Sequence, residues 1–291
     1  DPVRAVWDAV FMAISVFNNA GFVILPEGLS PHVTDWWMLI PIILGTTVGA
    51  IGFPVIMDVA KNLRTPRRWR LHTKLTLSTY LILAFVGALA LALTEWNNPA
   101  TLGAIDTPSK ILNAMLAGVN SRSSGLSALD VGAMQTQTHF VQDILMMIGG
   151  GSASTAGGVK VTTFAVLVLA VIAEARGDRD IETFGRRIPT SAVRLAVAVS
   201  LLGLALVAVS VVLLLSMTSY SLDIILFETA SAFATVGLST GITPILPVGA
   251  KYVLIFLMFA GRTGSMTVAA ALALRERSRV IRMPEERPII G

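Results

Sequence analysis

A glycine- and serine-rich run between two apolar stretches constrains this chain most. Residues 149–158 read Gly-Gly-Gly-Ser-Ala-Ser-Thr-Ala-Gly-Gly and separate the apolar runs 140–148 and 159–173. Together the two runs are long enough to cross a bilayer, so the glycines fall near its middle. Lipid cannot hydrogen-bond bare amides, and non-helical backbone persists there only where protein buries it or it lines a watery cavity. The pattern predicts a broken span beside a permeation pathway.

The composition agrees with a chain that crosses the membrane several times. Of its 291 residues, 54% are hydrophobic and only 14% are charged, whereas soluble domains are about one quarter charged. The mean hydropathy is +0.74. The absence of cysteine excludes disulfides, thiolate zinc sites and cysteine nucleophiles. We therefore expect an all-α membrane protein.

The positive charges are concentrated in three segments. Sixteen of the 22 lysines and arginines lie within residues 61–74, 176–194 and 275–287. Four other loops carry none: residues 23–35, 95–109, 127–139 and 239–250. The positive-inside rule makes the basic segments and the C-terminus cytoplasmic and the bare loops external. Membrane-proximal basic faces explain the sequence pI, and no nucleic-acid partner is expected.

Long and short apolar segments alternate along the chain. Spans are predicted at residues 36–61, 73–96, 140–175 (the broken one), 191–217 and 248–274. Shorter apolar helices, which cannot span, are predicted at residues 5–17, 111–119 and 223–233. Each short helix runs into a glycine-containing loop.

These segments form an internal repeat of span, short re-entrant helix, glycine loop and span. The loop glycines Gly21, Gly125 and Gly237 recur at intervals of 104 and 112 residues. A glycine within the following span comes 26 to 28 residues later each time, at Gly49, Gly151 and Gly264. The sequence contains two full units and one that lacks its first span, so we expect the protein to continue upstream.

A short helix that enters the membrane and ends in a glycine loop is the arrangement of an ion-selectivity filter. Backbone carbonyls there replace the hydration shell of a monovalent cation, and glycine permits the backbone angles required. Residues 235–237 repeat the start of the potassium-channel sequence TVGYG but lack its Tyr-Gly. A tight interfacial turn is the alternative for any one loop, and three recurrences favour the filter.

Several motifs together carry a resemblance to a known family. They are Phe-Asn-Asn-Ala-Gly-Phe at 17–22, Ser-Ala-Phe-Ala-Thr-Val-Gly-Leu-Ser at 231–239, the run 149–160, Gly-Arg-Thr-Gly at 261–264, Glu285-Glu286 and Ile-Ile-Gly at 289–291. With them the chain resembles the Trk/Ktr/HKT superfamily of potassium transporters, most closely its bacterial KtrB-like branch. The resemblance implies four span–pore helix–filter loop–span units around a pseudo-fourfold ion pore.

The resemblance also implies a division of the chain. Residues 1–62 correspond to the second unit without its first span, and residues 63–175 to the third unit with an intramembrane gating loop at 149–158. Residues 176–276 correspond to the fourth unit, and residues 277–291 to a C-terminal tail.

The site residues follow from the same resemblance. Three of four filter walls, whose carbonyls would bind K⁺, are Asn19, Ala20, Gly21, Ser123, Ser124, Gly125, Thr235, Val236 and Gly237. The gate is assigned to Gly149, Gly150, Gly151, Ser152, Gly157, Gly158 and Arg262.

Arg262 and four further charged residues have expected roles of their own. A mid-span cation such as Arg262 raises the barrier to potassium or clamps loop carbonyls, and the role of Lys160 is ambiguous. Arg122 is expected to tether the filter from behind. Asp8 and Glu228 are expected to begin short helices, where they stabilise the helix dipole or attract cations.

Other chemistries fit less well. A serine hydrolase at Ser152 would need a nearby histidine, but His32, His72 and His139 are predicted near the membrane surfaces. A phosphate loop fails because Val159 separates Gly158 from Lys160, and the scattered histidines offer no metal site. A secondary transporter with a midplane site would have inverted repeats. Sodium permeation or sodium coupling on the same fold stays open.

The family resemblance supplies the expected partners and location. It implies a homodimer in the bacterial cytoplasmic (inner) membrane, working with a cytoplasmic ring of nucleotide-binding KtrA-type subunits. The nucleotide would belong to that ring, and no covalent cofactor is expected on this chain. The basic segments suit docking of the ring or binding of anionic membrane lipids.

Overall fold

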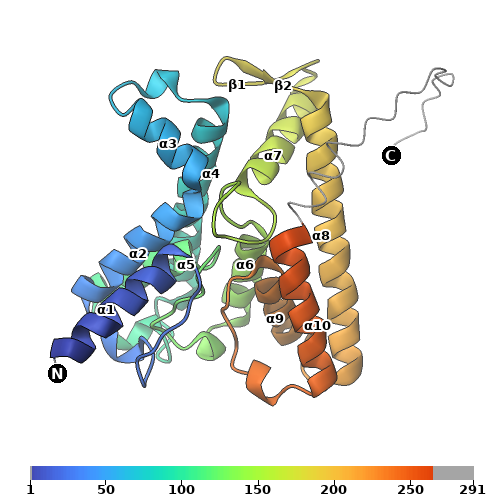
Figure 1. Ribbon diagram of the computed structural model, residues 1–291. Coiled ribbons are helices and arrows are strands. Elements are labelled where there is room, and N and C mark those ends of the chain that lie inside the picture. The colour runs from blue at the N-terminus through green and yellow to red at the C-terminus, as the bar shows by residue number, and fades with distance from the viewer. Residues whose placement is uncertain (1, 265–291) are drawn as a thin grey trace.

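The computed structural model describes residues 2–264 and consists mainly of helices (Figure 1). The α-helices are α1 (Pro2–Phe17), α2 (Trp36–Ile51), α3 (Phe53–Lys61), α4 (Leu71–Glu95), α5 (Thr107–Asn120), α6 (Thr136–Met147), α7 (Val161–Arg176), α8 (Thr190–Met217), α9 (Leu222–Ala234) and α10 (Val248–Phe259). A π-helical turn (Ala260–Gly264) follows α10. Short 3-10 turns lie at Ser30–His32, Pro66–Arg68, Leu102–Ala104, Val131–Ala133 and Thr243–Ile245. The all-α prediction is confirmed.

Among residues 2–264, two helices are long and apolar enough to cross a membrane by themselves. They are α4, with 25 residues, and α8, with 28, and they match the spans predicted at 73–96 and 191–217. The predicted broken span consists of α6 and α7 joined by the non-helical segment 148–160. The last predicted span, 248–274, is described only as far as residue 264.

The span predicted at residues 36–61 consists of two helices, α2 and α3, which together are long and apolar enough to cross a membrane but form a bent pair. The helix is broken at Gly52, and α3 leaves α2 at an angle of 94°. Gly52 has a φ of +88°, a conformation that glycine adopts without the penalty of a side chain. Pro54 sits in the first turn of α3, where its missing N–H costs no helical hydrogen bond.

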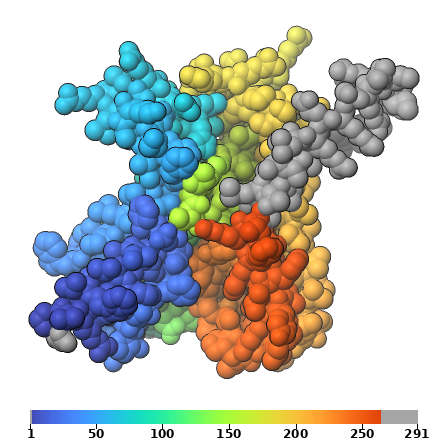
Figure 2. Space-filling model, viewed as in Figure 1, coloured from blue at the N-terminus to red at the C-terminus, as the bar shows by residue number. Residues whose placement is uncertain are grey.

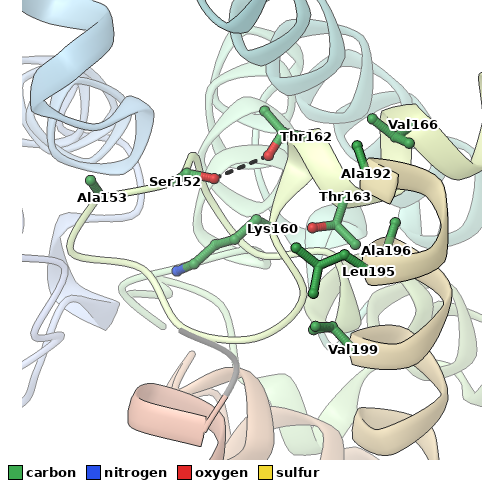
Figure 3. A pocket seen from close by; sticks show the side chains of 10 residues that line it. All are labelled: Ser152, Ala153, Lys160, Thr162, Thr163, Val166, Ala192, Leu195, Ala196 and Val199. Carbon is green, nitrogen blue, oxygen red and sulfur yellow. Dashed lines mark hydrogen bonds between the residues drawn. The ribbon is translucent and has the colours of Figure 1, made fainter. Parts of the chain in front are cut away.

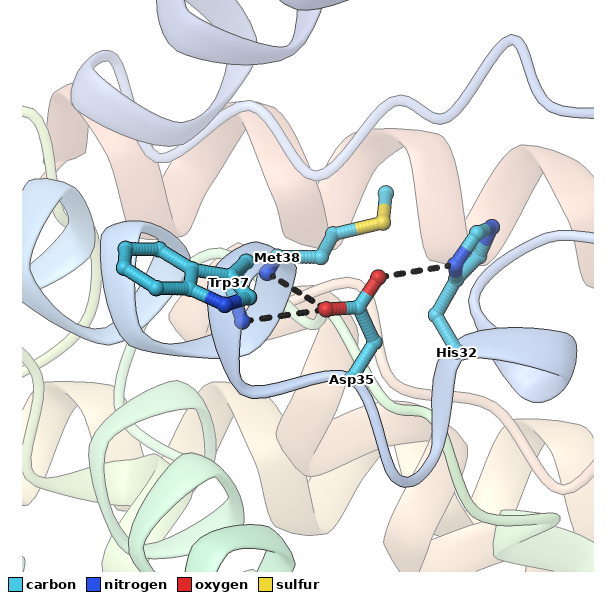
Figure 4. A network of polar contacts seen from close by, with 4 residues as sticks. All are labelled: His32, Asp35, Trp37 and Met38. Carbon is cyan, nitrogen blue, oxygen red and sulfur yellow. Dashed lines mark hydrogen bonds and ion pairs between the residues drawn. The ribbon is translucent and has the colours of Figure 1, made fainter.

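The start of α2 is fixed by a side-chain cap. Asp35 accepts hydrogen bonds from the backbone N–H groups of Trp37 and Met38, at 3.0 and 3.2 Å (Figure 4). These donors have no partner inside the helix, so the carboxylate satisfies them. His32 Nδ1 lies 3.5 Å from the other carboxylate oxygen. The cap sets the boundary between the polar loop and the apolar helix.

Each short helix packs against a long one through small residues. Helix α5 lies on α4 where Gly118 meets Gly87, and a Cβ on Gly118 would lie 2.4 Å from the Ala84 carbonyl oxygen. Helix α9 lies on α8, where Gly203 faces the ring of Phe233. These close approaches hold the C-terminal ends of α5 and α9 at fixed places.

The basic segment 176–194 contains an element that the sequence did not indicate. Strands β1 (Ile181–Thr183) and β2 (Arg186–Ile188) form an antiparallel hairpin. Its turn places Phe184 under Lys74, with the ammonium 5.8 Å from the ring centroid. The hairpin therefore reaches from α7 and α8 across to the start of α4 (Figure 1).

Candidate filter and intramembrane loop

The middle glycine loop, around Gly125, touches both of the other glycine loops, which are far apart from it in sequence. A Cβ placed on Gly21 would lie 2.1 Å from the carbonyl oxygen of Ser124. One placed on Gly125 would lie 2.3 Å from that of Val236 and 2.8 Å from the Cα of Gly237. No side chain fits at these contacts, so the backbones of neighbouring loops pack directly against each other. The structure thus brings together the three segments predicted as filter walls.

The backbone of these loops has an unusual conformation. Asn19 and Gly21 have φ angles of +53° and +74°, and Thr235 and Gly237 have +51° and +96°. The residue between each pair does not have a positive φ, so left-handed and other conformations alternate along these two loops. In the middle loop the positive angles fall on Ser124 and the following glycine. Left-handed non-glycine residues are strained, and such strain clusters at functional sites.

The C-terminal ends of the three short helices lie next to the three loops. Helices α1, α5 and α9 end at Phe17, Asn120 and Ala234, directly before the three loops. The C-terminal end of a helix carries a partial negative charge from its free carbonyl groups. The three helix ends therefore place partial negative charge next to the three loops.

Arg122 contacts α4, in agreement with the tether expected from the sequence. Its side chain is fully buried, and its guanidinium donates to the Tyr80 carbonyl oxygen at 2.6 Å. The guanidinium also stacks on the Tyr80 ring, 3.8 Å from the centroid. Arg122 therefore ties the middle loop to α4.

Glu228 and Asp8 do not begin helices, and that expectation is wrong. Helix α9 starts at Leu222 and α1 starts at Pro2, so both acids lie one to two turns inside. Glu228 is 4% exposed. Its carboxylate accepts hydrogen bonds from Ser239, Thr240 and Thr243 at 2.6 to 2.9 Å. It thus anchors the chain that leaves the third loop.

The segment 148–160, which contains the predicted intramembrane loop 149–158, lies against the first and third candidate filter loops. Figure 2 shows it in yellow-green between the blue N-terminal helices and the orange α10. Gly149 N–H donates to the Val159 carbonyl and closes the segment at its base, at 2.8 Å. A Cβ on Gly157 would lie 2.2 Å from Thr235 Oγ1, so the segment contacts the third filter loop. Glycine is needed at these positions because neighbouring atoms fill the space of a side chain.

Two positively charged side chains donate hydrogen bonds to neighbouring backbone carbonyls of this segment. Arg262, from the π-helical turn, donates to the Thr155 carbonyl oxygen. Lys160 Nζ donates to the Ala156 carbonyl oxygen at 2.6 Å, and its side chain is buried. Both side chains therefore bind the backbone at adjacent residues, Thr155 and Ala156. The structure therefore gives Lys160, ambiguous from sequence, a partner beside that of Arg262.

A cavity of about 380 Å³ opens beside the segment, between α7 and α8 (Figure 3). Lys160 and Thr162 line it together with apolar residues such as Leu195 and Val199. Ser152 Oγ pairs with Thr162 Oγ1 at 3.1 Å rather than with a histidine. Within residues 2–264, no three His, Cys, Asp or Glu side chains gather as a metal site would require.

Thr155 is a contact residue that was not predicted from the sequence. Its hydroxyl accepts a hydrogen bond from Asn19 Nδ2 at 2.6 Å and donates to the Gly49 carbonyl oxygen at 3.1 Å. A threonine in a glycine- and serine-rich run carries no pattern that would have marked it. Glu285-Glu286, residues 289–291, the 277–291 tail and the basic segment 275–287 lie outside the described residues.

Comparison with known proteins identifies relatives along nearly the whole chain. Residues 1–281 match TrkH, a family described as cation transport proteins. The Ktr system potassium uptake protein B of Bacillus subtilis is 39% identical over 283 residues, which cover 97% of this chain and 63% of that protein. The potassium/sodium uptake protein NtpJ of Enterococcus hirae is 34% identical over 295 residues, which cover 99% of this chain and 65% of that protein.

A solved structure shares the fold. The crystal structure of the potassium transporter TrkH from Vibrio parahaemolyticus superposes with a TM-score of 0.72 at 17% sequence identity. The match covers 92% of this chain and 58% of that one. The chain therefore spans less than two thirds of the length of each of these relatives.

Proposed function

The chain belongs to the TrkH family of cation transport proteins, and from this premise we propose that the protein carries potassium into the cell through a carbonyl-lined filter. Membership confirms the predicted family and a transporter rather than an enzyme. The observation that carries the potassium proposal is that the Gly125 loop contacts both the Gly21 loop and the Gly237 loop, each of which follows the end of a short helix. Carbonyl rings of this kind replace the hydration shell of potassium.

The filter in this proposal consists of the carbonyls of residues 19–21, 123–125 and 235–237. A fourth wall, which the pseudo-fourfold arrangement requires, would come from outside these three loops. Potassium uptake is the activity in the names of the Ktr relatives, and potassium/sodium uptake is in that of NtpJ. Sodium permeation or coupling is therefore the second candidate.

The gate in this proposal is the segment 149–158, held by Arg262. The segment lies against Thr235 and Asn19 at the inner end of the filter. An arginine there places a positive charge in the path of a cation, which raises the barrier to permeation. Displacement of the segment would remove both the steric and the electrostatic obstacle.

Partners and location belong to the same proposal. The protein would act as a homodimer in the bacterial cytoplasmic membrane, with a nucleotide-binding ring on the side of the basic segments. Residues 61–74 and 176–194 expose arginines near the ends of α4 and α7, where a ring or anionic lipid headgroups can bind.

The test is potassium and sodium flux into liposomes that contain the full-length protein. Wild type should pass potassium in preference to sodium. Gly237→Ser replaces a residue with φ of +96° and should lower the selectivity ratio by about tenfold. Arg262→Ala should raise flux by about tenfold, equivalent to about 1.4 kcal/mol off the barrier. A wild type that carries no cation, with or without a cytoplasmic regulatory subunit, would refute the proposal.

A further inference from the structure

Thr155 connects the intramembrane segment to the filter by its side chain, whereas Arg262 and Lys160 hold only main-chain carbonyls. The Thr155 hydroxyl accepts from Asn19 Nδ2 at 2.6 Å and donates to the Gly49 carbonyl oxygen at 3.1 Å. Its own carbonyl accepts from Arg262. One residue thus touches α2, the π-helical turn and the first residue of a filter loop.

Asn19 makes this contact from a left-handed backbone conformation. It has a φ of +53° and is 6% exposed. The Nδ2 donor has one other acceptor among residues 2–264, the Phe17 carbonyl oxygen, at the long distance of 3.5 Å. In the same part of the chain, Asn19 Oδ1 has no hydrogen-bond partner. Thr155 is therefore the principal partner of this side chain.

Gly49 packs closely against Asn19 and restricts where the Asn19 side chain can lie. A Cβ on Gly49 would lie 2.7 Å from Asn19 Nδ2 and 1.9 Å from the Phe17 carbonyl oxygen. Glycine at position 49 opens the space in which the amide reaches Thr155. The amide, the glycine and the hydroxyl thus form one close-packed contact between the filter loop and the gate segment.

We propose that Thr155 is a positioning residue that couples the intramembrane segment to the filter through Asn19. With the segment in place, the hydroxyl holds the Asn19 side chain and supports its left-handed backbone. When the segment moves aside, Asn19 loses this partner and the inner end of the filter can rearrange. The inference rests on the proposed function and adds that the gate alters ion selectivity as well as ion access.

Coupling of the segment to the filter and simple tethering of the segment predict different effects on ion flux. A tether that only kept the segment in place would change how much ion passes, but not which ion. A residue that also positions a filter side chain changes both. The discriminating measurement is therefore the ratio of potassium to sodium flux alongside the total flux.

The experiment uses the full-length protein in liposomes and four variants. Thr155→Val keeps the shape but removes the hydroxyl, and Thr155→Ser keeps the hydroxyl. Thr155→Ala is a smaller replacement in case valine prevents folding. Thr163→Val is the matched control, since Thr163 lies on α7 outside the contact with Asn19.

Thr155→Val and Thr155→Ala should raise potassium flux about fivefold, equivalent to about 1 kcal/mol for the lost hydrogen bonds. They should also lower the potassium-to-sodium ratio severalfold, while Thr155→Ser and Thr163→Val behave as wild type. Raised flux with an unchanged ratio would overturn the coupling, as would an unchanged flux and ratio. Both results leave the proposed function standing, because that fails only if wild type itself carries no cation.

Discussion

At the scale of single residues, the glycines separate into those that need only a backbone angle and those that also need empty space. Gly125 has a φ of +59°, and a Cβ there would lie 2.3 Å from the Val236 carbonyl oxygen and 2.6 Å from the Gly237 carbonyl carbon. Gly28 has a similar φ of +64°, but a Cβ there would meet no atom of the described residues within 4 Å. The pair therefore distinguishes conformational strain from steric conflict.

We expect Gly125→Ala to abolish selective potassium flux, because the methyl group would push two filter loops apart. Gly28→Ala should retain flux and selectivity. Both variants should lose about 1 kcal/mol of stability from the left-handed conformation, with a further loss in Gly125→Ala. Flux assays and thermal unfolding of the purified proteins check this. Equal effects of the two variants would contradict the close contact between the loops.

At the scale of elements, the sequence predicts those features whose cause is local. The break at 149–158 was predictable because a run of glycines and serines strongly disfavours a helix. The short helices were predictable from the length of their apolar runs. The bend at Gly52 was not, because a glycine followed closely by Pro54 is compatible with both a kinked and a straight span. The contact of Thr155 with Asn19 joins positions 136 residues apart, so no local pattern encodes it.

The bend at Gly52 has a functional consequence that can be tested. A Cβ at Gly52 would lie 2.6 Å from the Ser152 carbonyl oxygen, so the hinge supports the intramembrane segment directly. We expect Gly52→Ala to displace that segment and raise ion flux by about tenfold, from a barrier lower by about 1.4 kcal/mol. Gly177→Ala is the matched control, because Gly177 has a φ of +74° and open space around it. If Gly177→Ala raised flux equally, the contact with Ser152 would not be the cause.

At the scale of the whole molecule, α4 holds two groups of loops apart. Near its first turn, Lys74 lies over Phe184 of the hairpin. At its last residue, Glu95 accepts a hydrogen bond from Gln135 N–H at 2.8 Å. At that same end of α4, the loop 23–35 contacts α5, because Asn113 Nδ2 donates to the Val33 carbonyl oxygen at 2.7 Å. The loops without basic residues thus gather at one end, and the arginine-rich hairpin lies at the other.

This arrangement predicts that Glu27 and Glu182 lie on opposite sides of the membrane. Both are exposed, and residues 1–291 contain no cysteine, so Glu27→Cys and Glu182→Cys form a matched pair of labelling sites. A membrane-impermeant thiol reagent added to intact cells should label position 27 and not 182. Inside-out vesicles should give the reverse, because the basic segments stay in the cytoplasm. Labelling of both positions from one side would show that α4 does not separate the two groups of loops across the bilayer.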